Sequence, residues 1–81
     1  MSPISRAKFT VSHKEKITGY AGWESHNVVL NPVYDSNPES ENGKFYKATP
    51  SGTIRLEGLK EETANLFTVG QAYYVDFTPA N

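Results

Sequence analysis

The chain has 81 residues, of which 37% are hydrophobic and 12% aromatic, and it has no cysteine. A single domain of this length has a thin core, because it buries only about 60% of the surface that its unfolded form exposes. The lack of cysteine excludes disulfides and thiolate metal sites, so homo-oligomerisation is open as a further source of stability. Eight basic and nine acidic residues give a net charge of -1, which argues against a protein whose main partner is nucleic acid.

Two strands are expected in the N-terminal half. Apolar and polar residues alternate over 7–11, the period of a half-buried strand, and 27–34 is rich in β-branched residues. Pro32 cannot donate to a ladder, so the second strand should lie at an edge or bulge there. Between them, the stretch "TGYAGWES" at 18–25 contains two glycines and predicts a loop.

A hairpin is expected around "TPSG" at residues 49–52. Residues 44–48 and 53–58 would be its two strands, and the polar stretch 35–43 before them would be a loop. Gly52 fits the fourth position of a type I turn. We therefore expect the third and fourth strands to pair with each other.

The only expected helix covers residues 59–67, where apolar residues fall on one helical face. Gly70 would end this region. Tyr73, Val75 and Phe77 then alternate with polar or exposed positions, so a final strand should place all three in the core.

These elements predict a mainly β, single domain over residues 1–81. Its expected form is a small five-stranded antiparallel barrel or rolled sheet with one short helix before the last strand. This order of elements matches an SH3-like barrel better than an OB-like one.

The segments "GKFYKATPSGTIRLEGL" and "FTVGQAYYVDFTPA" resemble a group of short, uncharacterised β-rich proteins encoded by tailed bacteriophages and prophages. The resemblance covers roughly residues 44–80. It implies a phage gene product that acts in a bacterial host, and it carries over no functional residues.

Catalytic and metal-binding motifs are not recognised in the sequence. His13 and His26 have none of the spacings of zinc motifs, and no phosphate-binding loop is found. Ser12 and His13 are adjacent, but neighbours in a regular strand point to opposite faces, so they should not act as nucleophile and base. We expect no enzyme, no catalytic residues, no metal and no cofactor.

Two aromatic clusters are candidates for binding. In the 18–25 loop, Tyr20 and Trp23 are of the types most enriched at binding hot spots, although Trp23 could instead fold back over the core. The second cluster consists of Lys44, Phe45, Tyr46 and Lys47. Stacking aromatics beside lysines could hold a nucleotide, although a half-buried strand with solvated lysines would show the same pattern.

The sequence therefore favours a small phage-encoded accessory protein that acts by binding, as a host-interaction or anti-defence factor. Its partner would be a host protein or a small nucleotide ligand. The alternatives are a protein of phage replication that binds single-stranded nucleic acid, and a structural or decoration protein of the virion. No run of apolar residues is long enough to cross a membrane and the N-terminus lacks a signal peptide, so a cytoplasmic location is expected.

Overall fold

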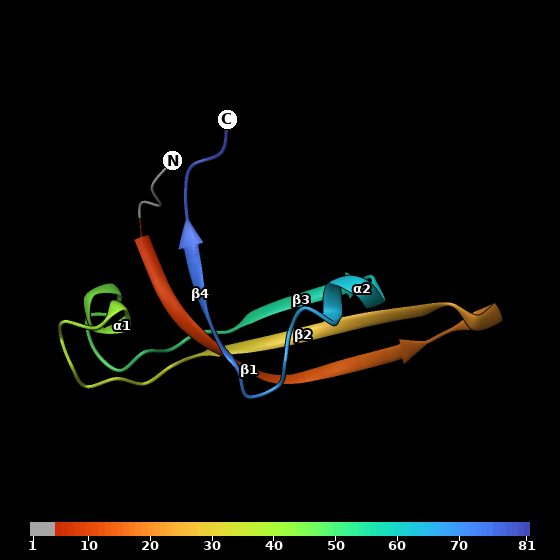
Figure 1. The fold of residues 1–81 in the computed structure, drawn as a ribbon, viewed down its shortest axis with the longest axis horizontal. Helices are drawn as coiled ribbons and strands as arrows, with labels where there is room; N and C mark the ends of the chain where they lie inside the picture. Colours follow the sequence, from red (N-terminus) through yellow and green to blue (C-terminus); the bar gives the residue numbers. More distant parts are fainter. Residues whose placement is uncertain (1–4) are drawn as a thin grey trace.

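The computed structural model describes residues 5–81, which form a mainly β structure. The elements in chain order are β1 (Ser5–Thr18), the 3-10 helix η1 (Tyr20–Gly22), β2 (Glu24–Pro32), α1 (Glu41–Phe45), β3 (Ile54–Leu59), α2 (Glu61–Ala64) and β4 (Ala72–Phe77). Four strands make one antiparallel sheet in the order β3-β2-β1-β4. The β1–β2 hairpin is thus the centre of the sheet, and β3 and β4 are its edges (Figure 1).

Strand β1 is long because its two halves pair with different strands. Residues 5–10 pair with β4, and residues 9–18 pair with β2. Only residues 26–30 of β2 pair with β3, so the distal part of the hairpin extends beyond the other strands (Figure 1). We call residues 17–25 the arm. It contributes to the elongated shape of the molecule, which measures 50 × 31 × 17 Å.

The core occupies one face of the sheet. Alternate residues of β1 and β2 meet α2 there, as period-2 patterning requires. The buried apolar residues are Ala7, Phe9, Val11, Val28, Leu30 and Ala64, and the partly buried ones packed against them are Ile54, Leu59, Phe67, Tyr73 and Val75. The strands expected over 7–11 and 27–34 are therefore confirmed in position, but the second ends at Pro32 and lies inside the sheet, not at its edge.

The expected strand over residues 44–48 is wrong, and with it the five-stranded barrel. Residues 41–45 form α1, whose N-cap Ser40 accepts a hydrogen bond at 3.0 Å from the backbone N–H of Gly43. The hairpin around 49–52 does not form either, because β3 pairs with β2 instead. What the described residues form is an open sheet of four strands, with neither SH3-like nor OB-like closure. Gly52 has a positive φ of 131°, but it does not lie in a hairpin turn.

A short helix before the last strand is confirmed, but it is only Glu61–Ala64. Leu66 is 72% exposed, so the apolar face expected over 59–67 does not extend that far. In the segment after the helix, the Tyr73 hydroxyl accepts a hydrogen bond from the Thr68 N–H at 2.9 Å and donates one to the Leu66 carbonyl at 3.2 Å.

The last strand is confirmed as β4, but the prediction that all three of its alternating residues are buried is wrong for one of them. Tyr73 and Val75 pack against the core as expected. Phe77 is 49% exposed, because it pairs with Ser5 at the far end of β1, beyond the buried residues. Within the described residues, none of the helices has the length and apolar character needed to cross a membrane.

Candidate functional site

The tip of the arm is a tight turn that displays aromatic side chains. The Gly19 N–H donates to the Trp23 carbonyl at 2.7 Å, and the Trp23 N–H donates to the Tyr20 carbonyl at 2.9 Å. Ala21 and Gly22 between them both adopt positive φ, at 54° and 76°. Left-handed backbone at two successive residues is uncommon outside such turns, and it fixes the direction in which the flanking side chains project.

Tyr20 and Trp23 are both on the surface. Tyr20 is 97% exposed and Trp23 is 59% exposed. The indole ring of Trp23 lies over the backbone of Gly19, since a Cβ atom at Gly19 would come within 2.8 Å of Trp23 Cε3. Trp23 is therefore held against its own turn and does not fold back over the core, which was the alternative left open by the sequence.

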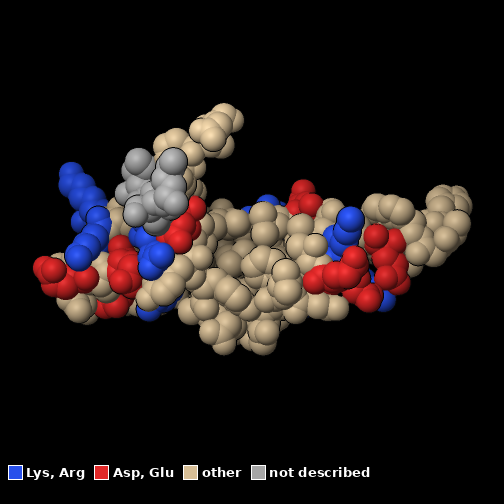
Figure 2. All heavy atoms as spheres, turned by 45° about the horizontal axis from the view of Figure 1, so that its top comes forward, with Lys and Arg blue, Asp and Glu red and all other residues tan. Residues whose placement is uncertain are grey.

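The arm is uncharged at its tip and charged where it joins the sheet. Residues 17–23 carry no ionisable acid or base other than the Tyr20 phenol, and the tip is free of charged side chains in Figure 2. Just behind the tip, Lys16 Nζ and Glu24 Oε1 form an ion pair at 3.2 Å. An aromatic, uncharged end bordered by charged residues has the composition of the centre and rim of a protein interface.

The second predicted cluster is not a single site. Lys44 and Phe45 line a hollow together with Ser5, Arg6 and Glu41. Phe45 stacks on Tyr46 with ring centroids 4.9 Å apart and lies 6.1 Å from the Phe77 ring. Phe45 therefore contacts two other aromatic rings, although it is still 39% exposed.

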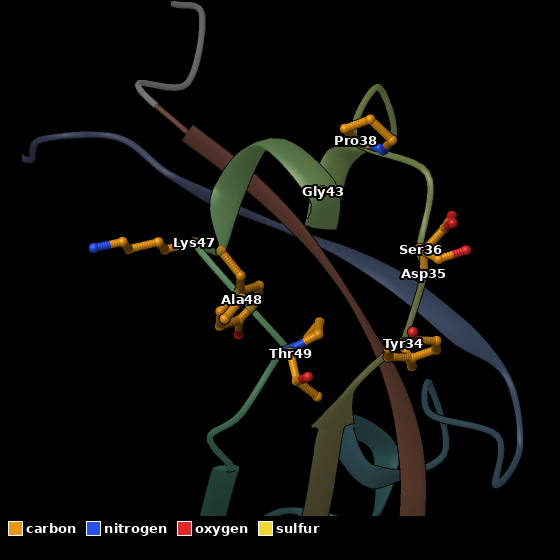
Figure 3. Close-up of a pocket in the computed structure, with 10 residues that line it drawn as sticks. Tyr34, Asp35, Ser36, Pro38, Gly43, Lys47, Ala48 and Thr49 are labelled. Atoms are coloured by element: carbon orange, nitrogen blue, oxygen red, sulfur yellow. The ribbon is translucent and has the colours of Figure 1, made fainter.

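Tyr46 and Lys47 border a different hollow, between the segment after β2 and the segment after α1 (Figure 3). Its volume is about 290 Å³, and its lining residues are Tyr34, Asp35, Ser36, Pro38, Gly43, Tyr46, Lys47, Ala48, Thr49 and Pro50. The Lys47 side chain points away from Tyr34 in Figure 3. A hollow of about 290 Å³ is small for a nucleotide. The Asp35 carboxylate in its lining also disfavours phosphate.

Ser12 and His13 lie closer than a regular strand would allow. The register of β1 against β2 shifts between Val11 and His13, so Ser12 is an extra residue in a β-bulge. Ser12 Oγ is 3.2 Å from His13 Nδ1, and His13 Nε2 is 3.4 Å from Glu15 Oε2. The prediction that this pair faces apart is wrong.

Glu15 is held chiefly by other partners. Its Oε1 accepts hydrogen bonds from Asn27 at 2.9 Å and from Arg55 at 2.7 Å, and these lower the pKa of Glu15 to about 2. Arg55 also donates to Glu57 at 2.6 Å. The group is a polar network on the face of the sheet opposite the core, and the exposed Ser12–His13 pair lies at its end.

A third aromatic group escaped prediction because it depends on strand pairing. Tyr74 on β4 lies opposite Lys8 on β1, and the Arg6 guanidinium is 4.7 Å and the Lys8 ammonium 5.6 Å from the centre of its ring. Arg6 also pairs with Asp76 at 2.6 Å, which lowers the pKa of that carboxyl. Only the register of β1 against β4, which the sequence does not specify, brings these residues together.

Comparison with known proteins gives no matching family model, no similar curated protein and no similar solved structure.

Proposed function

We propose that this protein acts by binding a partner protein through the tip of its arm, with Tyr20 and Trp23 as the main contacts. The observation that carries this proposal is the position of two largely exposed aromatic side chains at the uncharged end of a projecting hairpin. Such side chains bury a large area at low entropic cost, since each has few rotatable bonds.

The turn supports recognition because it organises the aromatic side chains before any partner arrives. Trp23 is held by its ring contact with Gly19 and by two backbone hydrogen bonds across the turn. A side chain that is already ordered loses less conformational entropy on binding. We further propose a phage accessory protein that targets a protein of the bacterial host, which is what the resemblance of residues 44–80 would imply.

A protein partner fits these features better than a nucleotide does. The tip has no cation to hold a phosphate, and the hollow beside Tyr46 and Lys47 is small and bordered by Asp35. Single-stranded nucleic acid is a second candidate, favoured by the two cations that flank Tyr74.

The test compares the double variant Tyr20→Ala/Trp23→Ala with Tyr74→Ala, which removes an exposed aromatic from another part of the surface. Each protein is used to capture partners from a bacterial lysate, and affinity for a captured protein is then measured. We expect the double variant to weaken that affinity by at least about 30-fold, as loss of a hot spot does, and to melt near the wild-type temperature.

Tyr74→Ala should bind like the wild type. Equal capture by all three proteins would refute the role of the tip. Loss of binding in Tyr74→Ala alone, together with binding of a labelled single-stranded oligonucleotide at low salt, would favour nucleic acid instead.

A further inference from the structure

Three potential metal ligands converge where the arm joins the body of the molecule. Glu24 and His26 are two residues apart on β2, so their side chains leave the same face of the strand. Glu61 reaches the same point from the first turn of α2. One carboxylate oxygen from each glutamate and one ring nitrogen of His26 all lie within 4.8 Å of one another.

The His26 ring has an unusual environment. Its Nε2 atom is buried and has no hydrogen-bond partner. It is the one such side-chain atom found among residues 5–81. Buried polar atoms are nearly always paired, and a neutral imidazole offers a lone pair that a metal ion can accept.

The donor set selects a class of metal. One imidazole nitrogen with two carboxylate oxygens suits zinc and its first-row neighbours, whereas calcium and magnesium prefer oxygen donors alone. Zinc bonds of about 2.0–2.2 Å place tetrahedral donors about 3.4 Å apart. Both glutamates are exposed, so rotation of their side chains can close the remaining distance.

We propose that Glu24, His26 and Glu61 bind a divalent transition-metal ion, with Zn²⁺ as the best fit, and that the ion joins α2 to the base of the arm. Three protein ligands leave a fourth position for water or a further ligand. This inference does not rest on the proposed role of the aromatic tip.

One cation already competes for this position. Lys16 Nζ lies 3.2 Å from Glu24 Oε1, and Lys16 is directly opposite His26 in the β1–β2 register. An ion bound at the site must share or displace this ammonium group. Removal of the Lys16 charge should therefore strengthen metal binding, whereas removal of any proposed ligand should weaken it.

Calorimetric titration of the full chain with ZnCl₂ tests the site, and CoCl₂ serves as a probe because tetrahedral Co²⁺ absorbs visible light. We expect one ion per chain. His26→Gln and Glu61→Gln should each weaken binding at least about tenfold, since even groups that only support metal ligands contribute that much. Lys16→Gln should bind more tightly.

Two matched controls make the test specific. Glu62→Gln changes the next residue of the same helix, and His13→Gln changes the other histidine, which lies beside Glu15. Both should bind Zn²⁺ within about twofold of the wild type. If His26→Gln fails to fold, Glu61→Gln alone tests the site, because Glu61 is exposed and its replacement should not unfold the protein. The proposal is overturned by no binding at millimolar Zn²⁺, by equal losses in Glu61→Gln and Glu62→Gln, or by loss in His13→Gln.

Discussion

Asn42 holds α1 against the sheet, and its replacement should be among the most damaging polar substitutions in this protein. The side chain is buried, with 3% of its surface exposed. Its Oδ1 accepts a hydrogen bond from the Lys8 N–H at 2.6 Å, and its Nδ2 donates to the carbonyls of Lys8 at 2.8 Å and Val33 at 2.7 Å. One amide thus joins α1, β1 and the segment after β2.

Asn42→Ala removes all three hydrogen bonds. Each contributes about 1 kcal/mol net, and a partner left buried without a bond costs more. The Lys8 carbonyl still accepts a hydrogen bond from the Val33 N–H at 3.0 Å, so it is not left unpaired. The free energy of unfolding should therefore fall by about 2–3 kcal/mol in total. For a domain of this size that lowers the melting temperature by about 8–24 °C.

Asn42→Asp is the sharper test, because it preserves size and shape. The carboxylate can still accept from the Lys8 N–H, but it cannot donate to the two carbonyls and places negative charge beside them. We expect it to destabilise the fold at least as much as alanine does, as measured by urea unfolding. Asn31→Asp, at an exposed position of β2, should stay within about 0.5 kcal/mol of the wild type. If Asn42→Asp melts within a few degrees of the wild type, the three hydrogen bonds do not hold α1 in place.

Two further predictions concern Glu15 and Phe77. The pKa of Glu15 is lowered from 4.5 to about 2, so its contribution to stability is complete above about pH 4.5 and is lost as the pH falls toward 2. The difference in melting temperature between the wild type and Glu15→Gln should therefore shrink as the pH falls through that window. A constant difference would mean that the pKa of Glu15 is not lowered by its hydrogen bonds. Phe77→Ala should cost only about 1 kcal/mol in urea unfolding because Phe77 is half exposed, whereas Phe9→Ala, at a 5% exposed position, should cost about 3–5 kcal/mol. Equal losses would mean that Phe77 is covered in solution.

The strands were predictable where one face is apolar. Residues 7–11, 27–34, 44–48, 53–58 and 73–77 show the signals of strands, and a strand forms close to each of these positions except 44–48. The extension of β1 through His13 and Glu15 was not predictable, because those residues face a polar network in place of a core. Period-2 alternation marks only a strand with one buried face.

Helix α1 was missed for a different reason. Its sequence, ENGKF, contains asparagine and glycine, which are poor helix formers. The helix is fixed by the Ser40 cap and by the hydrogen bonds of Asn42 to residues far away in the sequence. Tertiary contacts of this kind override local propensity, and they also leave the sheet with four strands.

The candidate sites also differ in whether the local sequence or only the fold reveals them. Tyr20 and Trp23 could be nominated because a large aromatic in a glycine-containing loop is conspicuous in sequence. The group of Glu24, His26 and Glu61 could not, since the spacing of Glu24 and His26 matches no zinc motif and Glu61 comes from an element packed against them only in the folded chain. A glutamate and a histidine two residues apart, just before the strand predicted over 27–34, were the one local signal present.

The arm contributes little to the stability of the fold, and it is where we propose that a partner binds. Residues 17–23 are all exposed, so they add almost nothing to the buried core. Under our proposal, a partner protein covers the exposed Tyr20 and Trp23 side chains. Glu24 follows Trp23 directly in the chain, so a metal ion at Glu24, His26 and Glu61 would fix the base from which the tip projects. The two proposals remain independent, because replacing Tyr20 and Trp23 leaves every metal ligand in place and replacing Glu61 leaves the tip unchanged. If both hold, the ion acts on recognition through the ordering of the arm, which lowers the entropy lost when a partner binds.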